Sequence, residues 1–347
     1  MNANIKKIIS ALTESESGKK QMEVWDWFQG VALYGLYLYY EKTQDQEVFD
    51  YLTDWFDKQI EKGEPIWNVN SLSPLLTLTF LYEKTKKETY LARCKRGVQY
   101  ATKELLRTEE GGFQHVTLDS NNDRQLWGDT LYMGALFMAR MGILQTQQGC
   151  AQEGDAYIQE SIRQFLLHIK YLSDTETGLF YHGYNFIGKH HYAGAHWGRC
   201  NAWIIASLVE ILDFADGYLP GAVKMYLHGT LETLADTLAQ YQDAQGMWHT
   251  LVDDLEGSYQ EASATSGIAY AMLKAVRLGL LPDKFKECAL RALPAIDGLI
   301  DEEGFCGQVS AGTCLENTLD YYRNIKINRQ PYGQSLALLF LLEAENC

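Results

Sequence analysis

Helical periodicity extends along nearly the whole chain, and this pattern restricts the possible folds more than any other feature. Apolar residues recur at spacings of three and four, which is typical of helices that bury one side. Prolines are few, and Pro65, Pro220 and Pro282 lie at segment edges, where helices begin or end. The sequence predicts an all-α protein with helices near 3–13, 20–42, 45–61, 72–84, 88–107, 125–141, 154–172, 198–213, 221–241, 258–279, 283–297 and 330–344.

Several of these segments are apolar on more than one face, as in ALYGLYLYY, SLVEIL and SLALLFLLE. A helix that contacts water on one side needs only a single apolar stripe, so this pattern favours an inner ring of helices covered by an outer ring. No linker-like stretch divides the chain, and we expect one domain over 1–347. Ordered long loops are usually functional, and a pocket is expected where they cap the ring: 108–124, 173–197, 243–257 and 298–328.

Charge and composition limit the partners. The 30 basic and 45 acidic residues give a net charge of −15, which argues against nucleic acid as a partner. A small anionic fragment could still enter a pocket that holds a few basic groups. Aromatic residues reach 12%, which suits either a large core or a sugar-binding cleft.

The N-terminal segment has no signal-peptide core, and no stretch of membrane-spanning length lacks charges. We therefore expect a cytoplasmic protein without membrane association. The seven cysteines are scattered without a CxxC pair, which indicates free thiols. His190 and His191 have no convincing third ligand nearby, so neither a metal site nor another cofactor is expected.

Asp129, in QLWGDTLYM, is the outstanding candidate for catalysis. It is expected early in the helix predicted over 125–141, flanked by Trp127 and Tyr132. Partial dehydration there would raise the pKa of the carboxyl, as a general acid near neutral pH requires. The alternative is a structural carboxylate that stabilises the first turns of the helix through its dipole.

A second group of candidates surrounds HWGRCNAW. Arg199 has a planar fork suited to a carboxylate, and Trp197 has a face suited to stacking on a sugar, although Arg199 could equally pair with an acid. His182 lies in a predicted loop, where a lone histidine is more often solvated than catalytic. Ser258 and Glu261 match the capping-box spacing, so Glu261 is assigned to helix capping.

Four blocks together resemble the unsaturated rhamnogalacturonyl hydrolases of glycoside hydrolase family 105, and more distantly the unsaturated glucuronyl hydrolases of family 88. They are QLWGDTLYM, HWGRCNAWIIASLVEIL, SYQEASATSGIAYAMLKAVRLGLL and YGQSLALLFLLE. The resemblance implies an (α/α)6 barrel of six helical hairpins that needs no metal. It also implies hydrolysis of small unsaturated oligosaccharides, the lyase products of pectin, by hydration of the C4=C5 bond of the terminal uronate.

The resemblance also implies roles for individual residues. Asp129 matches the general acid/base, and His182 matches a loop histidine that faces the substrate. Trp197 and Arg199 match a pair that stacks on the sugar and meets its carboxylate. An aromatic and a histidine at the pocket correspond to Trp27 and His115.

Asn70, in WNVNSLSP, departs from the family pattern, because relatives often carry an aspartate there. An amide keeps hydrogen bonding but supplies no charge, so specificity or activity could differ. Three alternatives stay open: the same chemistry on glucuronyl units, a sugar 2-epimerase using His182 and His196, and a non-catalytic sugar binder or helical scaffold. A monomer or a homodimer is expected.

Overall fold

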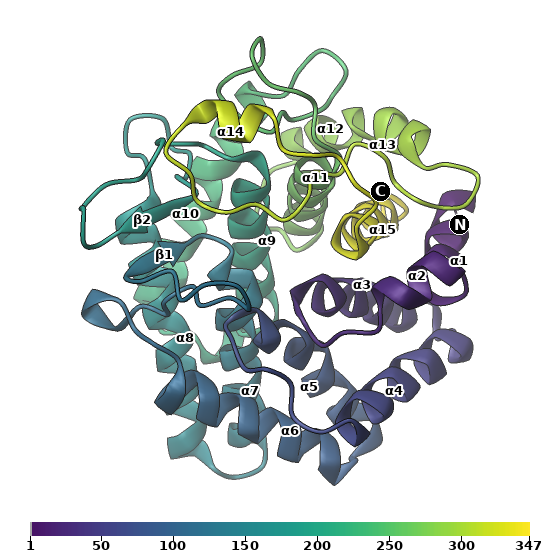
Figure 1. The fold of residues 1–347 in the computed structure, drawn as a ribbon, viewed down its shortest axis with the longest axis vertical. Coiled ribbons are helices and arrows are strands. Elements are labelled where there is room, and N and C mark those ends of the chain that lie inside the picture. Colours follow the sequence, from purple (N-terminus) through teal and green to yellow (C-terminus); the bar gives the residue numbers. More distant parts are fainter. Residues whose placement is uncertain (1) are drawn as a thin grey trace.

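The computed structural model describes residues 2–347, and most of its helices lie in two concentric rings (Figure 1). Each inner helix contacts the next in chain order, and the last contacts the first, so the inner ring is closed. This confirms the predicted all-α barrel. The inner helices are α3 (Trp27–Thr43), α5 (Ser73–Thr85), α7 (Leu136–Gln147), α9 (Gly198–Phe214), α11 (Ala262–Arg277) and α15 (Pro331–Ala344).

Each inner helix packs against one outer helix. Five of these pairs are consecutive in the sequence: α3 with α4, α5 with α6, α7 with α8, α9 with α10, and α11 with α12. The sixth joins α15 to α1, so the two ends of the chain complete the ring together. The outer helices are α1 (Ala3–Thr13), α4 (Gln46–Glu61), α6 (Glu88–Gln99), α8 (Ala151–Leu172), α10 (Gly221–Gln240) and α12 (Lys284–Arg291).

Burial follows the apolar patterns. In α9 every residue from Gly198 to Leu212 is buried, because other helices or loops cover all its sides. In α4 the buried residues form one stripe at helical spacing, from Val48 through Leu52 and Trp55 to Gln59. Multi-face apolarity therefore marks the inner ring, and single-stripe amphipathicity marks the outer ring.

Two helices predicted as continuous are divided. The predicted helix at 20–42 overlaps the end of α2 (Glu16–Gln21) and then α3, with a break between them. The break occurs because the Asp26 carboxylate accepts a hydrogen bond from the Trp27 amide at 2.9 Å and caps α3. The predicted helix at 283–297 consists of α12 and α13 (Leu293–Leu299), which has a proline in its first turn.

The predicted helix at 125–141 is wrong at its start. Residues Gln125–Trp127 form β1, which pairs antiparallel with β2 (Gly183–Asn185). The helix begins only at η4 (Leu131–Ala135), a π-helical turn, and continues as α7 to Gln147. Pairing with a segment far along the chain outweighs the local helical pattern here.

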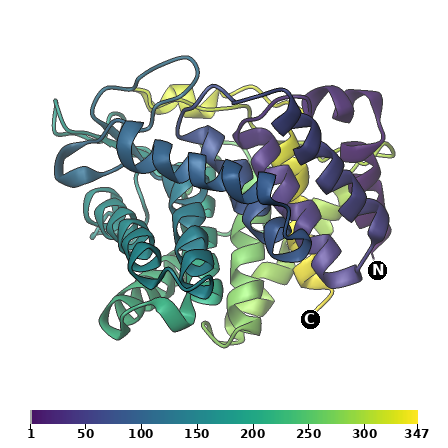
Figure 2. The ribbon, with the colours of Figure 1, turned by 90° about the horizontal axis from the view of Figure 1, so that it is seen from below.

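The predicted loops gather on one side of the molecule, together with α14 (Leu319–Arg323) (Figure 2). The remaining short elements are η1 (Asn70–Leu72), η2 (Tyr100–Glu104), η3 (Glu109–Gly111) and η5 (Asp216–Tyr218). Within residues 2–347, no helix has both the length and the apolar character needed to cross a bilayer.

Candidate active site

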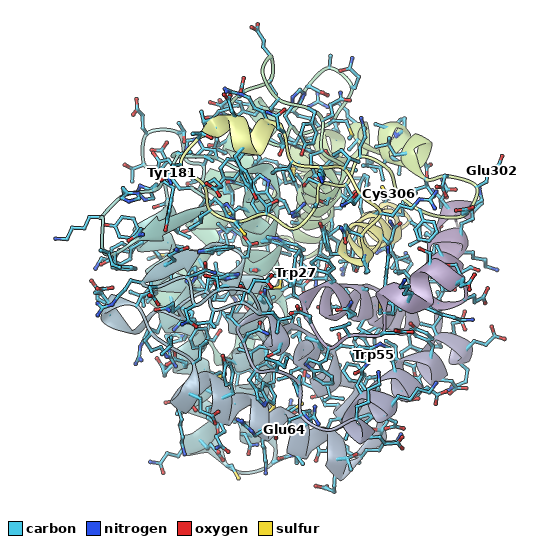
Figure 3. All side chains as sticks on the ribbon, in the orientation of Figure 1. Trp27, Trp55, Glu64, Tyr181, Glu302 and Cys306 are labelled. Atoms are coloured by element: carbon cyan, nitrogen blue, oxygen red, sulfur yellow. The ribbon has the colours of Figure 1, made fainter. Side chains whose placement is uncertain are left out.

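A pocket of about 250 Å³ opens at the end of the barrel where the inner helices begin. Residues at the starts of α3 and α9 and just before α5 contribute to its wall, and Trp27 lies near the centre of the ring (Figure 3). The positive ends of these helix dipoles favour a negatively charged ligand. The pocket is lined by Asp26, Trp27, Phe28, Asn70, His115, Thr117, Leu118, Asp119, Trp127, Asp129, Met133, Trp197, Arg199, Gly312, Thr313 and Cys314.

Asp129 lies in the turn between β1 and η4, and its side chain is almost fully buried. Its Oδ1 has no hydrogen-bond partner among the described residues. Burial raises the pKa of Asp129 from the ordinary 3.8 to about 7, although the nearby positive charge of Arg199 opposes this rise. Asp129 can therefore hold a proton near neutral pH and also release it.

Gly128 fixes the position of this turn. Its amide donates to the carbonyl of His182 at 3.0 Å, which ties the turn to the residue just before β2. A Cβ atom at this position would lie 2.4 Å from Cys200 Sγ, so only glycine lets the turn approach α9 so closely. The Asp129 carboxyl is thus held against two other parts of the chain.

His182 is buried beside Asp129, with its Nε2 3.7 Å from Asp129 Oδ1. Its Nδ1 is hydrogen-bonded to the hydroxyl of Tyr322 at 2.9 Å, and its ring lies 4.4 Å from that of Trp197. Burial lowers the pKa of His182 well below its ordinary value, so the imidazole is neutral. His182 does not line the open pocket, but it borders the acid.

His115 lines the pocket and is also neutral. Its ring stacks on Trp127 at 4.2 Å, with the two planes 8° apart. Its Nδ1 is hydrogen-bonded to Thr130 Oγ1 at 2.8 Å, and burial lowers the pKa of His115 to about 3. Asp129 therefore has two uncharged imidazoles in its surroundings.

Arg199 is fully buried, and both terminal nitrogens of its guanidinium bind the segment 310–313. They donate to the carbonyl oxygens of Ser310 and Ala311 at 2.8 and 2.7 Å. The guanidinium lies 4.4 Å from the ring of Trp197, and only Nε has no partner among residues 2–347. Nη1 also lies 3.9 Å from Oε1 of the buried Glu261, so Arg199 pairs with an acid and does not present an open fork to the pocket.

The remaining predicted residues differ in position. Trp27 lines the pocket and stacks on Tyr332 at 4.5 Å. Asn70 lines the pocket from η1, where its amide donates to Asn68 Oδ1 at 2.8 Å. Tyr132 is not brought to the pocket: it is buried behind the floor, with its ring 4.8 Å from that of Trp203.

Glu261 caps α11, as predicted, but not through a capping box. Its carboxylate accepts from the amides of Ala264 and, at 2.8 Å, Ser310, so it is itself the N-cap residue. The hydroxyl of Ser258 instead donates to the carbonyl of Asp254 at 2.7 Å. Glu261 and Arg199 therefore hold the same segment, 310–313, over the pocket.

His196 lies outside the pocket, between two carboxylates. Its Nδ1 is 2.7 Å from Asp253 and its Nε2 is 3.3 Å from Asp174. It is therefore not placed to act with His182 in the pocket, which removes the pair that an epimerase reading requires. No cluster of His, Cys, Asp and Glu within residues 2–347 is arranged to hold a metal ion.

Sequence reasoning missed several pocket residues, mainly because they lie in loops without a periodic signal. Asp26, before the apolar helix in VWDWF, could have been found as an N-cap, since it precedes the first helical residue. Thr117, Leu118 and Asp119 carry no signal beyond their place in a predicted functional loop. Cys314 reaches the wall only through the path of the last long loop.

Comparison with known proteins places this geometry in a family. The family model described as Glycosyl Hydrolase Family 88 matches residues 2–347. The chain is 33% identical over 341 residues to the unsaturated rhamnogalacturonyl hydrolase YesR of Bacillus subtilis, covering 97% of this chain and 94% of the relative.

Solved structures agree with this placement. A possible member of family GH105 from Salmonella enterica superposes with a TM-score of 0.92 at 38% identity, covering 99% of this chain and 93% of that one. An unsaturated glucuronyl hydrolase from Bacillus sp. GL1 superposes with a TM-score of 0.69 at 17% identity, covering 92% and 87%. This second likeness shows the fold alone.

Proposed function

The chain belongs to glycosyl hydrolase family 88 and is a glycoside hydrolase, and from this premise we propose that it removes unsaturated galacturonyl residues from rhamnogalacturonan-lyase products. The Bacillus subtilis relative YesR is an unsaturated rhamnogalacturonyl hydrolase. The observation that carries the proposal is the Asp129 carboxyl, which lies in the pocket wall with a pKa of about 7. Such a group can act first as an acid and then as a base.

In the proposed reaction the protonated Asp129 donates its proton to C4 of the C4=C5 vinyl ether. The positive charge that develops at C5 is shared with the ring oxygen. Water then adds at C5 and gives its proton to the Asp129 carboxylate, which restores the acid. The resulting hemiketal opens and releases the neighbouring sugar and a 4-deoxy-5-keto uronate, so one water is consumed for each bond broken.

The surroundings of Asp129 support this role. His115 and His182 are neutral, so neither offers a fixed positive charge that would hold Asp129 permanently ionised. Arg199 lines the pocket and is paired with Glu261 at 3.9 Å, so the starts of the inner helices and the guanidinium together attract the uronate carboxylate. Trp27 offers ring surface for the sugar, whereas Trp197 lines the pocket with only 1% of its surface exposed.

The test measures loss of the ultraviolet absorbance of the unsaturated uronate when purified protein is added to the galacturonyl–rhamnose disaccharide. We expect Asp129→Asn to be slower by roughly a hundredfold or more, since it cannot deliver a proton. Asp123→Asn, an exposed aspartate of the 108–124 loop that does not line the pocket, is the matched control. An Asp129→Asn protein as fast as the wild type would remove Asp129 from the mechanism.

The same assay with an unsaturated glucuronyl disaccharide tests the closest alternative. The likeness to glucuronyl hydrolases is structural, at 17% identity, and does not favour that substrate. Faster turnover of the glucuronyl disaccharide would replace the galacturonyl assignment and leave the role of Asp129 unchanged.

A further inference from the structure

The charged groups of the pocket separate by depth. Asp129 and Arg199 are buried in the inner part, with 8% and 0% of their surfaces exposed. Asp26 and Asp119 lie nearer the opening: Asp26 is half-buried at the start of α3, and Asp119 is exposed in the 108–124 loop. Because Arg199 is also paired with buried Glu261 at 3.9 Å, the inner part has no excess of positive charge, and the rim is negative.

Neither rim carboxylate is neutralised by a basic side chain. Among the ion pairs of residues 2–347, none includes Asp26 or Asp119. Asp26 accepts one hydrogen bond, from the Trp27 amide, through Oδ1. The two carboxylates also act on each other: burial raises the pKa of Asp26 to about 6, and the charge of Asp119 adds to this rise. Both carboxylates can therefore still accept hydrogen bonds from a ligand.

The size of the pocket indicates which sugar of a disaccharide lies deep and which lies at the rim, and this step rests on the proposed function. The unsaturated residue has to reach Asp129, in the deep part. At about 250 Å³ the pocket is smaller than the 300–1,000 Å³ usual for drug-sized ligands, so little beyond that residue is enclosed. The leaving sugar must then lie at the rim, against Asp26 and Asp119.

We propose that Asp26 and Asp119 select an uncharged leaving sugar. Their hydrogen-bonding capacity suits the hydroxyl groups of a neutral sugar, whereas a second uronate or a sulfated sugar would bring like charges together. Leu118, with 48% of its surface exposed, and Phe28 lie in the same wall and present an apolar surface beside the acids. A neutral sugar with an apolar edge, such as a deoxy sugar, matches both features.

Binding to Asp129→Asn protein, measured by calorimetry, tests this without turnover. The two ligands are unsaturated disaccharides that share the galacturonyl residue and carry either rhamnose or galacturonate as the second sugar. At low salt we expect the rhamnose ligand to bind at least about tenfold more tightly, because like charges repel at the rim. Adding Asp26→Asn and Asp119→Asn is expected to reduce this ratio to below about threefold.

The controls separate charge from structure. Asparagine is as good an N-cap as aspartate, so Asp26→Asn keeps the start of α3. Asp123→Asn removes an exposed charge from the same loop and should leave the ratio unchanged. Raising the salt to 1 M, where charges are screened beyond about 3 Å, should also narrow the ratio; a purely structural effect would not respond to salt.

The proposal is overturned if the starting protein binds both ligands equally, or if the ratio survives removal of both rim carboxylates. Binding of neither disaccharide would overturn it together with the proposed function. If the ratio behaves as expected but wild-type protein leaves both disaccharides intact, the proposed function fails and the rim selectivity stands.

Discussion

At the level of single residues, the burial of Asp129 raises the pKa of its carboxyl and also makes its charged form unfavourable in the folded protein. Its carboxyl is buried without a partner for Oδ1, so ionisation is disfavoured and its pKa rises to about 7. Arg199 limits this rise but does not form an ion pair with it. The same burial that makes Asp129 a usable acid makes its charged form unfavourable for folding.

The first prediction concerns the pH dependence of catalysis. In the proposed reaction Asp129 must be protonated at the start, so kcat/KM should fall as the pH rises through about 7, the pKa of Asp129. A pH profile of kcat/KM checks this.

The variant Asn70→Asp adds a like charge to the pocket wall, which should raise the pKa of Asp129 and move the fall in kcat/KM to higher pH. If the fall stays at the same pH, position 70 does not act on Asp129.

The second prediction concerns stability. The folded-state pKa of Asp129 lies above its unfolded value, so the stability of the protonated form is present below pH 3.8 and is lost as the pH rises through about 7. Asp129→Asn has no such loss. Its free energy of unfolding should exceed that of the wild type at pH 8 by up to about 4 kcal/mol, the upper bound from the pKa shift, with little difference at pH 4. Urea denaturation at both pH values measures this, and an equal difference at both would contradict it.

At the scale of elements, the strand–turn–helix joint from β1 to η4 positions the acid. β1 pairs with β2, the Gly128 amide bonds to the His182 carbonyl, and the helix begins only at Leu131. Asp129 therefore belongs to a turn that is held by β2, by His182 and by the start of the following helix.

The third prediction tests this joint. Gly128→Ala would place a Cβ atom 2.4 Å from Cys200 Sγ and must displace the turn or α9. We expect kcat to fall about tenfold or more, because misplacing a catalytic group by about 1 Å can cost a hundredfold. Adding Cys200→Ala removes the sulfur atom that clashes and should recover part of the activity. If the double variant is no better than the single one, the joint does not act through this contact.

Across the whole barrel, the two ends differ in the charged residues that line their cavities. The end opposite the pocket holds a cavity of about 580 Å³ lined by the last turns of inner helices. Glu210 is buried there and bonds to Lys274 at 2.8 Å and to Tyr34 at 2.7 Å. Because helix C-termini are negative, the positive charge of Lys274 suits this end, and its bonds to Glu210 and Asp213 connect α11 to α9.

The fourth prediction concerns this buried pair. Lys274→Met leaves Glu210 charged without its basic partner, which should cost about 3–5 kcal/mol of the free energy of unfolding. Changing Glu210→Gln in the same chain removes the unpaired charge and should recover much of that loss. Guanidinium denaturation of the three proteins measures it. Equal stability of the single and double variants would show that the charge itself is not the cause.

From the sequence alone, the helical ring could be predicted and Asp129 could be singled out as the leading catalytic candidate. Periodicity depends on neighbours three and four residues apart, so the multi-face apolar pattern of SLVEIL was enough to predict that its helix, α9, is covered by others. Asp129 could be recognised locally too, because it is an acid within an apolar segment, two residues after Trp127. The likeness to a family added the chemistry and further pocket residues, among them His115 and Trp27.

The arrangement of those residues could not be predicted from local patterns, because the contacts involved join distant parts of the chain. The turn at Asp129 depends on β2, more than fifty residues away, and Arg199 is bound by segment 310–313. Tyr132 lies behind the pocket for the same reason. The rim formed by Asp26 and Asp119 exists only because the start of α3 and the 108–124 loop meet at one opening. Local sequence patterns do not predict such long-range contacts, since each of them depends on the closure of the whole ring of helices.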